Sequence, residues 1–311
     1  MSFKQLIEEI RQYAAQNKIE HVAVALSGGA DSIATAMTLL KAGVHIEALH
    51  CNFHLRGEES LRDCQFVKVF CEENNIPLII KDFDVERHIN SHKSTSVEMA
   101  CRELRFSWFK EILLEGRVQR VALGHNADDN IETFFINLFR GSGTRGLKGI
   151  NKDNGKYWRP LLNITRKEIL NFLEENHQDF VIDSSNLTND YRRNYLRNTI
   201  IPQLKAEWKG FEKSMLSSIS YLSEENKIVE RAVQDLLKNS SALKVEDILS
   251  FPSPILLIRR FIEPAHPFTT TAQEIYDAIM ASKPHIRVWN VRKGIIKLRN
   301  RILSVEMSHC E

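Results

Sequence analysis

The stretch SGGADS, residues 27–32, combines two hydroxyls, two glycines and a carboxylate directly after the apolar run HVAVAL. A helix-like segment follows, so backbone amides and the positive end of a helix dipole should face an anion there. Glycines let the main chain come close to a ligand. We therefore predict a phosphate-binding loop, although a turn that caps a helix and binds nothing is the plainer alternative. The loop consists of Ser27, Gly28, Gly29, Ala30, Asp31 and Ser32.

The same loop lacks the lysine that a Walker A loop places on the β- and γ-phosphates of a nucleotide. Asp31 stands among its small residues instead. A carboxylate beside phosphates suits Mg²⁺, which binds one or two carboxylates together with phosphate oxygens. Asp31 is thus the predicted metal ligand.

A second polar cluster lies in LGHNADDNIETFF, residues 123–135, where a strand should end and a helix begin. Asp129 and Glu132 are three residues apart and share one helix face. Acids in a first helical turn also favour the helix dipole, which is the structural alternative. The additional His125 and Asp128 exceed what a cap needs, so this group is a candidate site for a metal or an incoming ammonium.

Basic residues form three further patterns. Arg102 and Arg105 lie three apart in EMACRELRF and could bind nucleotide phosphates or form intrahelical ion pairs. The loop RGSGTRGLKG and the stretch that follows it carry Arg140, Arg145 and Arg159, and residues 283–301 form a basic run around Trp289. Basic stripes with an aromatic residue are typical of nucleic-acid binding, although solvated faces also produce them.

The elements that must position these residues alternate between short apolar runs and helical periodicity. Such alternation predicts βαβ units and a parallel, doubly wound, Rossmann-like sheet with helices on both faces. Ligands then bind at the carboxyl ends of the strands, where SGGADS and His125 both fall. Strands are expected at residues 21–26, 44–50, 77–83 and 120–125. Helices are expected from the loop to about residue 40 and at 61–74, 97–115 and 127–140.

Length and composition support two domains. The 311 residues are 43% apolar and 26% charged, with a net charge of +2 that by itself indicates no polyanion partner. A catalytic domain is expected over residues 1–208 and a smaller, mostly helical one over 209–311, which ends in short strands over residues 286–305. The five scattered cysteines favour reduced thiols over disulfides or zinc, and no stretch is long enough to span a membrane. We expect a cytoplasmic protein.

Taken together, the motifs resemble those of the tRNA(Ile)-lysidine synthetases, a branch of the N-type ATP pyrophosphatases or PP-loop superfamily. The resemblance covers about residues 20–204, and order and spacing carry it more than any one motif. Its pieces are SGGADS, HCNFHLRGEES, EMACRELRF, LGHNADDNIET, RGSGTRGLKG, RPLLNITRKEI and DSSNLTNDYRRNYLRNTIIPQL.

The resemblance implies a fold of the adenine nucleotide alpha hydrolase type and a ligase that uses ATP and Mg²⁺. Such an enzyme adenylates C2 of the wobble cytidine in a CAU-anticodon isoleucine tRNA and then joins free lysine to it, releasing AMP and pyrophosphate. Carried over by position, Asp129 and Glu132 would receive the lysine ammonium, and His125 and Asp128 would support the site. Arg102 and Arg105 would contact nucleotide or RNA. The implied tRNA contacts are Arg140, Arg145, Arg192, Arg193 and Arg197.

Larger members of that family carry a further C-terminal domain, and here we expect one domain after the catalytic unit. Hydrophobic patterning does not set the oligomeric state, and a homodimer stays one arrangement to test.

Two other functions are alternatives to this interpretation. A tRNA thiolase would need paired cysteines, which this sequence lacks. A non-catalytic nucleotide-binding module with an RNA-binding tail would leave the acids at 128–132 without a role.

Overall fold

The computed structural model describes residues 2–91, 96–182, 192–237, 242–281 and 286–307. The chain divides into two compact units, Met1–Ser223 and Glu224–Glu311, and α11 (Phe211–Leu237) runs from the first into the second. The boundary that we predicted near residue 208 lies within the first unit. As a border between independently folding domains it stays a prediction.

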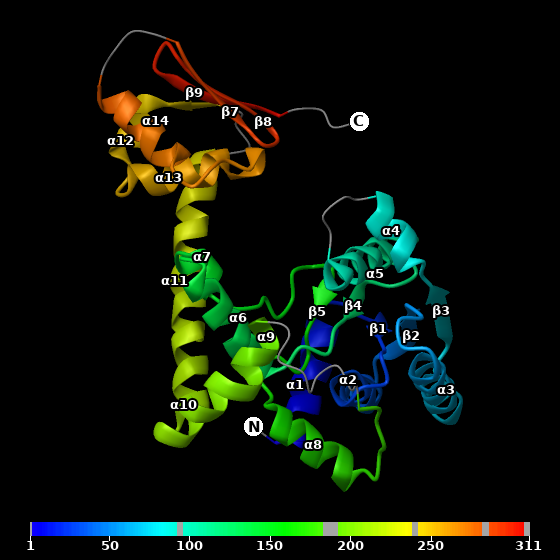
Figure 1. Cartoon of the computed structure of the whole chain (residues 1–311). Coiled ribbons are helices and arrows are strands. Elements are labelled where there is room, and N and C mark those ends of the chain that lie inside the picture. The colour runs from blue at the N-terminus through cyan, green and yellow to red at the C-terminus, as the bar shows by residue number, and fades with distance from the viewer. Residues whose placement is uncertain (1, 92–95, 183–191, 238–241, 282–285, 308–311) are drawn as a thin grey trace. The chain divides into compact units, whose positions relative to one another are not determined.

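The first unit contains a parallel sheet of five strands in the order β3-β2-β1-β4-β5 (Figure 1). The strands are β1 (His21–Ala25), β2 (His45–Asn52), β3 (Leu78–Asp82), β4 (Arg120–Ala122) and β5 (Tyr157–Trp158). The predicted parallel sheet is confirmed, and four strands lie close to their predicted positions. β5 was not predicted because two residues carry no periodicity that a pattern can register.

Both faces of this sheet are buried, as a parallel sheet requires. Val22 and Val24 of β1 join the core on one face, and Ala23 between them joins the core on the other. α1 (Phe3–Gln16), α2 (Ala30–Lys41), α3 (Glu58–Glu73) and α8 (Arg166–Glu175) supply side chains to the first core. α5 (Val97–Leu114) supplies Trp108 and Phe109 to the second.

The order of the strands places a topological switch point between β1 and β4. The chain moves outward from β1 through β2 to β3 and then returns to pair β4 with the other side of β1. Ligands of open α/β sheets bind in the crevice at such a point, beyond the carboxyl ends of the strands. The SGGADS loop follows β1, and the His125 segment follows β4.

Shorter helices complete the first unit. α4 (Val85–Ser91) precedes α5, and α6 (Ala127–Phe139) follows β4. The basic loop after α6 contains α7 (Thr144–Leu147). A continuous helical segment then comprises α9 (Arg192–Tyr195), the π-helical turn η2 (Leu196–Ile200) and α10 (Ile201–Glu207).

The second unit contains an antiparallel sheet of four strands in the order β6-β9-β8-β7, so the expectation of a mostly helical domain was wrong. Ile296 and Leu298 of β8 point into the core, whereas Lys297 between them pairs with Glu306. The short strands that we expected over residues 286–305 are therefore present, in a stretch that we also interpreted as a basic run. The strands are β6 (Ala242–Lys244), β7 (Arg287–Val291), β8 (Gly294–Arg299) and β9 (Ile302–Met307). The helices are α12 (Val245–Ser250), α13 (Pro254–Ile262), η3 (Glu263–Ala265) and α14 (Thr271–Met280).

Within the described residues, no helix combines the length and the apolar character that crossing a membrane requires.

Candidate nucleotide and amine site

The SGGADS loop forms a tight turn between β1 and α2 that its own hydroxyls stabilise. The Ser32 hydroxyl lies 3.2 Å from that of Ser27 and donates to the Gly29 carbonyl oxygen at 2.8 Å. Gly28 has φ +89°, and a Cβ there would lie 3.3 Å from Val181 and Val67. Gly29 is the N-cap of α2 and provides no side chain to cap its amides. The start of α2 therefore has the features of an anion site.

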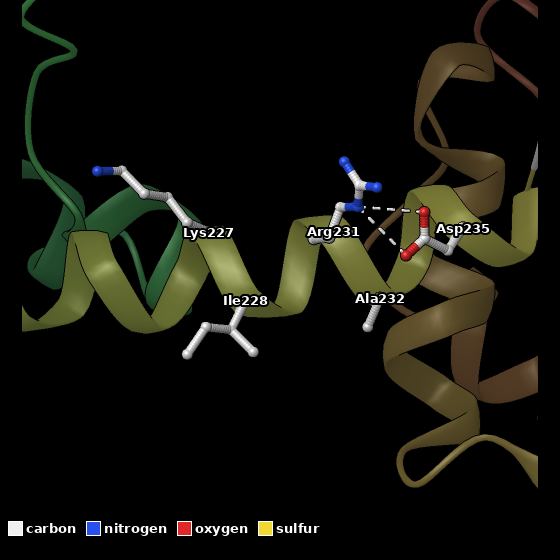
Figure 2. A pocket seen from close by; sticks show the side chains of 5 residues that line it. All are labelled: Lys227, Ile228, Arg231, Ala232 and Asp235. Atoms are coloured by element: carbon white, nitrogen blue, oxygen red, sulfur yellow. Dashed lines mark hydrogen bonds and ion pairs between the residues drawn. The ribbon is translucent and has the colours of Figure 1, made fainter.

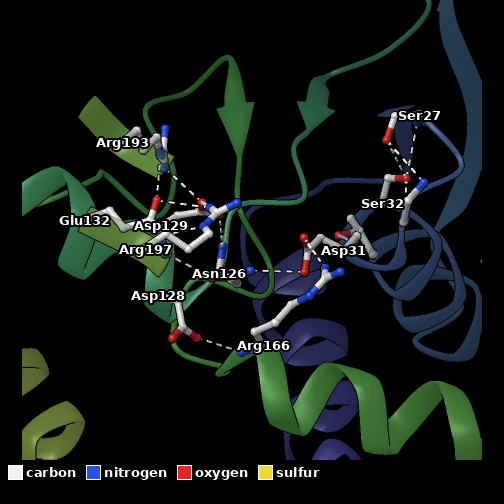
Figure 3. A network of polar contacts seen from close by, with 12 residues as sticks. Ser27, Asp31, Ser32, Asn126, Asp128, Asp129, Glu132, Arg166, Arg193 and Arg197 are labelled. Carbon is white, nitrogen blue, oxygen red and sulfur yellow. Dashed lines mark hydrogen bonds and ion pairs between the residues drawn. The ribbon is translucent and has the colours of Figure 1, made fainter. Parts of the chain in front are cut away.

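Asp31 lies in the first turn of α2 and contacts two other elements (Figure 3). Its carboxylate accepts a hydrogen bond from the Asn126 amide at 3.0 Å and pairs with the Arg166 guanidinium at 2.5 Å. Burial raises the pKa of Asp31, and the charge of Arg166 only partly offsets that effect. A second cation beside Asp31 would stabilise the ionised carboxylate.

The segment after β4 approaches the start of α2 closely because Gly124 has no side chain. A Cβ at Gly124 would lie 3.0 Å from the backbone carbonyl carbon of Asp31 and 3.1 Å from the nitrogen of Ser32. This approach places Asn126 within reach of Asp31. The two predicted clusters thus form one site at the switch point.

Asn126 joins the phosphate loop to the acids of α6. It is the N-cap of that helix and forms a reciprocal capping box with Asp129, with both N···O distances 3.0 Å. Its side-chain amide donates to Asp31 at the same time. Asn126 is 3% exposed, so this arrangement is fixed inside the protein.

Asp129 and Glu132 lie side by side on α6, as their spacing predicted, and two arginines bind them (Figure 3). Arg193 donates to Glu132 at 2.6 Å and to Asp129 at 2.8 Å. Arg197 donates to Glu132 at 2.6 and 3.0 Å and to Asp129 at 3.0 Å. Glu132 is 1% exposed. The four side chains form a compact ion-pair cluster between α6 and the α9–η2 segment.

Asp128 points to different partners from its neighbours. It accepts a hydrogen bond from the backbone N–H of Arg166 at 2.8 Å and from the Lys205 ammonium at 2.8 Å. Burial works to raise the pKa of Asp128, but these hydrogen bonds outweigh it and lower that pKa. Asp128 thus ties α6 to the start of α8 and to α10.

His125 lies directly before this cap and accepts a hydrogen bond at Nδ1 from Nε of Arg159 at 3.1 Å. Burial, together with the charges of Arg159, Arg193 and Arg102, lowers the pKa of His125 to about 4, although Asp129 opposes the shift. The imidazole is therefore neutral at physiological pH. Arg159, which we had counted among the basic residues of a candidate RNA-binding stretch, is 9% exposed.

The remaining arginines that we predicted as nucleotide or RNA contacts lie outside the ion-pair cluster. Arg102 is exposed on α5 and lies 4.7 Å from the ring centroid of Phe106, and its charge acts on His125. Arg105 lies 5.4 Å from the ring of Phe53. The other three are exposed: Arg140, Arg145 and Arg192.

The HCNFHLRGEES segment, residues 50–60, begins within β2, and its polar side chains contact neighbouring segments. Nδ1 of His50 lies 2.9 Å from the Leu26 carbonyl oxygen, and Asn52 donates to Asp82 at 2.9 Å. Arg56 pairs with the buried Asp63. The motif DSSNLTNDY, residues 183–191, lies outside the described residues.

Sequence reasoning missed Asn126, Arg159, Arg166 and Lys205 as members of the site. Asn126 stood in a quoted motif at a position suited to a helix cap, and Arg166 directly follows Thr165, the N-cap of α8. A separate hollow on α11 shares no residue with the site (Figure 2). Its lining residues are Lys227, Ile228, Arg231, Ala232 and Asp235.

The sheet order, the uncapped SGGADS loop and the neighbouring acids define an α/β nucleotide-binding protein of the PP-loop class. The family model of the PP-loop domain matches residues 2–204. A tRNA(Ile)-lysidine synthase of Bacteroides thetaiotaomicron is 37% identical over 90% of this chain and 66% of its own length. One of Parabacteroides distasonis is 36% identical over 94% of this chain and 67% of its own length. The chain belongs to the PP-loop family of tRNA(Ile)-lysidine synthases.

The chain spans about two thirds of the length of these curated relatives. Among solved structures, the U34-tRNA thiolase NcsA from Methanococcus maripaludis matches with a TM-score of 0.57. It is 20% identical and covers 71% of this chain and 79% of its own. That likeness concerns the fold alone.

Proposed function

We propose that this chain ligates free lysine to C2 of the wobble cytidine in a CAU-anticodon isoleucine tRNA, through an adenylated tRNA intermediate. The observation that carries the proposal is the position of Asn126, which bonds to Asp31 of the phosphate loop and to Asp129 of the acid cluster. One buried residue thus joins a place for ATP to a place for an amine. A ligation through an adenylate needs both within one crevice.

ATP belongs at the SGGADS loop, where backbone amides and the hydroxyls of Ser27 and Ser32 suit phosphate oxygens. Asp31 is the proposed ligand of Mg²⁺. The residues fit such an ion, because Asp31 is a single carboxylate at the phosphate loop whose raised pKa calls for further positive charge. When bound, the metal would neutralise phosphate charge. Arg102 and Arg105 are proposed contacts for nucleotide or RNA.

The chemistry proceeds in two displacements. O2 of the cytidine attacks the α-phosphorus of ATP, the bond to the β-phosphate oxygen breaks, and pyrophosphate leaves. The ε-nitrogen of lysine then attacks C2, the bond from C2 to the adenylate oxygen breaks, and AMP leaves. The lysine nitrogen loses one proton before the attack and another after it. Asp129 and Glu132 are proposed to bind this nitrogen, with His125 and Asp128 supporting the site.

The exposed Arg140, Arg145 and Arg192 are the proposed tRNA contacts, because a polyanion is best bound by accessible guanidinium groups. The substrates ATP, lysine and tRNA place the reaction in the cytoplasm. A homodimer remains part of the proposal for gel filtration to test.

The test is transfer of radiolabelled lysine to a transcript of this tRNA in the presence of ATP and Mg²⁺. We expect label that withstands mild alkali, which removes aminoacyl esters, and that vanishes when the wobble cytidine is replaced. ATP consumption that depends on the tRNA without stable label would refute lysine as the nucleophile.

A further inference from the structure

The acid pair presents a chemical problem for the proposed reaction. Free lysine carries an ammonium with a pKa of about 10.4, and only the unprotonated amine can attack carbon. Carboxylates within hydrogen-bond distance stabilise the charged form and raise the pKa of an ammonium further. Two unpaired acids would bind lysine well and keep it unreactive.

The structure shows that these acids are already paired. Each carboxylate of Asp129 and Glu132 receives N–H groups from both Arg193 and Arg197, at distances of 2.6 to 3.0 Å. Burial opposes the charge on Arg197, but its bonds with Glu132 outweigh burial and raise the pKa of Arg197. Two negative and two positive charges therefore balance within the cluster.

The paired carboxylates still have unused acceptor positions. A carboxylate offers about four acceptor positions. From the described residues, Oδ1 of Asp129 accepts two guanidinium N–H groups, and Oδ2 accepts the Asn126 backbone N–H. Oε2 of Glu132 accepts two and Oε1 accepts one. A lysine nitrogen could thus donate to Oδ2 of Asp129, the more accessible of the two acids, without displacing an arginine.

We propose that Arg193 and Arg197 are positioning residues for the amine step: they neutralise the acid pair, so that lysine is held by hydrogen bonds as a free amine rather than as an ammonium. This inference rests on the proposed function. Neighbouring guanidiniums and exclusion of water both favour loss of the ammonium proton to solvent as lysine enters. The nitrogen lone pair is then available for C2.

This role differs from the tRNA contact first expected for the two arginines. Arg193 and Arg197 lie one helical turn apart, and the π-helical turn η2 holds Arg197 against Glu132. Turns of this kind are frequent at functional sites. Arg192 precedes them and is exposed. It remains a candidate RNA contact.

Other charged groups around the cluster bear on its pH dependence. Asp31 and Asp128 act on Arg197, and His125 interacts with Asp129 and Arg193. His125, with a pKa of about 4, does not change charge in a neutral assay. A change in rate between pH 6 and 9 would therefore report chiefly on the amine.

The test times the amine step alone. Enzyme, tRNA and ATP are incubated first to form the adenylate, and the amine is then mixed in at pH 6 to 9. The second nucleophile is S-(2-aminoethyl)cysteine, which has nearly the shape of lysine but a less basic amine. The proteins are the wild type, R197Q, R197K and R117Q. R197K keeps the positive charge beside Glu132, and R117Q removes an exposed arginine that pairs with Glu115 outside the cluster.

We expect the wild-type rate with lysine to vary less than about 3-fold between pH 7 and 9 and to match that of the analogue within about 2-fold. In R197Q the lysine rate should fall at least 10-fold at pH 7 and rise about 10-fold per pH unit. The rate of R197Q with the analogue should fall much less. R197K should recover most of the wild-type rate with lysine. R117Q should keep the wild-type profile.

Two results would overturn the inference. One is a wild-type lysine rate that climbs about 10-fold per pH unit, which needs no variant and so does not depend on R197Q folding. The other is an R197Q enzyme whose rates with lysine and with the analogue fall by the same factor, and whose pH–rate profile is the same as that of the wild type. Failure of the proposed function looks different, because the wild type would then form no lysidine with either amine at any pH.

Discussion

Arg159 donates its Nε–H to Nδ1 of His125 across 3.1 Å, and both side chains are largely withdrawn from water. A guanidinium has no acceptor, so Nδ1 must be unprotonated and the proton of the neutral ring must be on Nε2. Arg159 thereby fixes which nitrogen of His125 can donate. The two residues are 34 positions apart in the sequence.

Burial of His125, together with the charge of Arg159, makes stability depend on pH. The pKa of His125 lies at about 4 in the fold, below the ordinary value of 6.5, so the unfolded chain binds more protons between these values. The stability from the neutral ring is complete above pH 6.5 and is lost as pH falls towards 4. We expect the wild type to lose about 2 kcal/mol more than His125→Asn between pH 6.5 and 4.5 in urea unfolding. Equal losses in the two proteins would place the titration elsewhere.

Asp31 should control the first displacement. Asp31→Asn keeps the shape of the side chain and a partner for Asn126 but removes the charge that pairs with Arg166 and would bind Mg²⁺. We expect tRNA-dependent pyrophosphate release to fall at least 100-fold. The comparison is release by wild type and variant over a range of Mg²⁺. A variant that retains more than a tenth of the wild-type rate would exclude this role.

Glu132 should act on the second displacement alone. Glu132→Gln keeps an oxygen acceptor but unbalances the charge around Arg193 and Arg197. We expect lysine KM to rise at least 10-fold while pyrophosphate release stays within about 3-fold of the wild type. Assays of both products in one reaction separate the steps. Equal loss of both steps would show that Glu132 supports the whole site rather than the amine.

The sequence predicted the parallel sheet well because buried strands are short apolar runs between turn residues. It also placed Asp129 and Glu132 on one face, since a spacing of three residues dictates that geometry. It could not pair them with Arg193, because 61 residues separate Arg193 from Glu132 and no local period records such a contact. The same limit hid Arg159 and Arg166. Short strands near the end of the second unit were also expected, but their pairing with β6 into one sheet was not, because no local period records which strands pair.

The close approach of Gly124 to the phosphate loop gives the last prediction. In Gly124→Ala the new methyl would lie 3.0 Å from the carbonyl carbon of Asp31 and 3.1 Å from the nitrogen of Ser32, and backbone atoms cannot swing aside as a flexible side chain can. The loop must shift, so we expect a loss of about 1–3 kcal/mol in unfolding free energy. ATP binding, measured by calorimetry, should weaken at least 10-fold. Gly143→Ala is the matched control, because φ is −75° there and no atom lies within 4 Å of the added methyl. It should change stability by less than about 0.5 kcal/mol. If Gly124→Ala is as well tolerated as this control, the two segments are not held together at that point, and the link between the phosphate loop and the acids must rest on Asn126 alone.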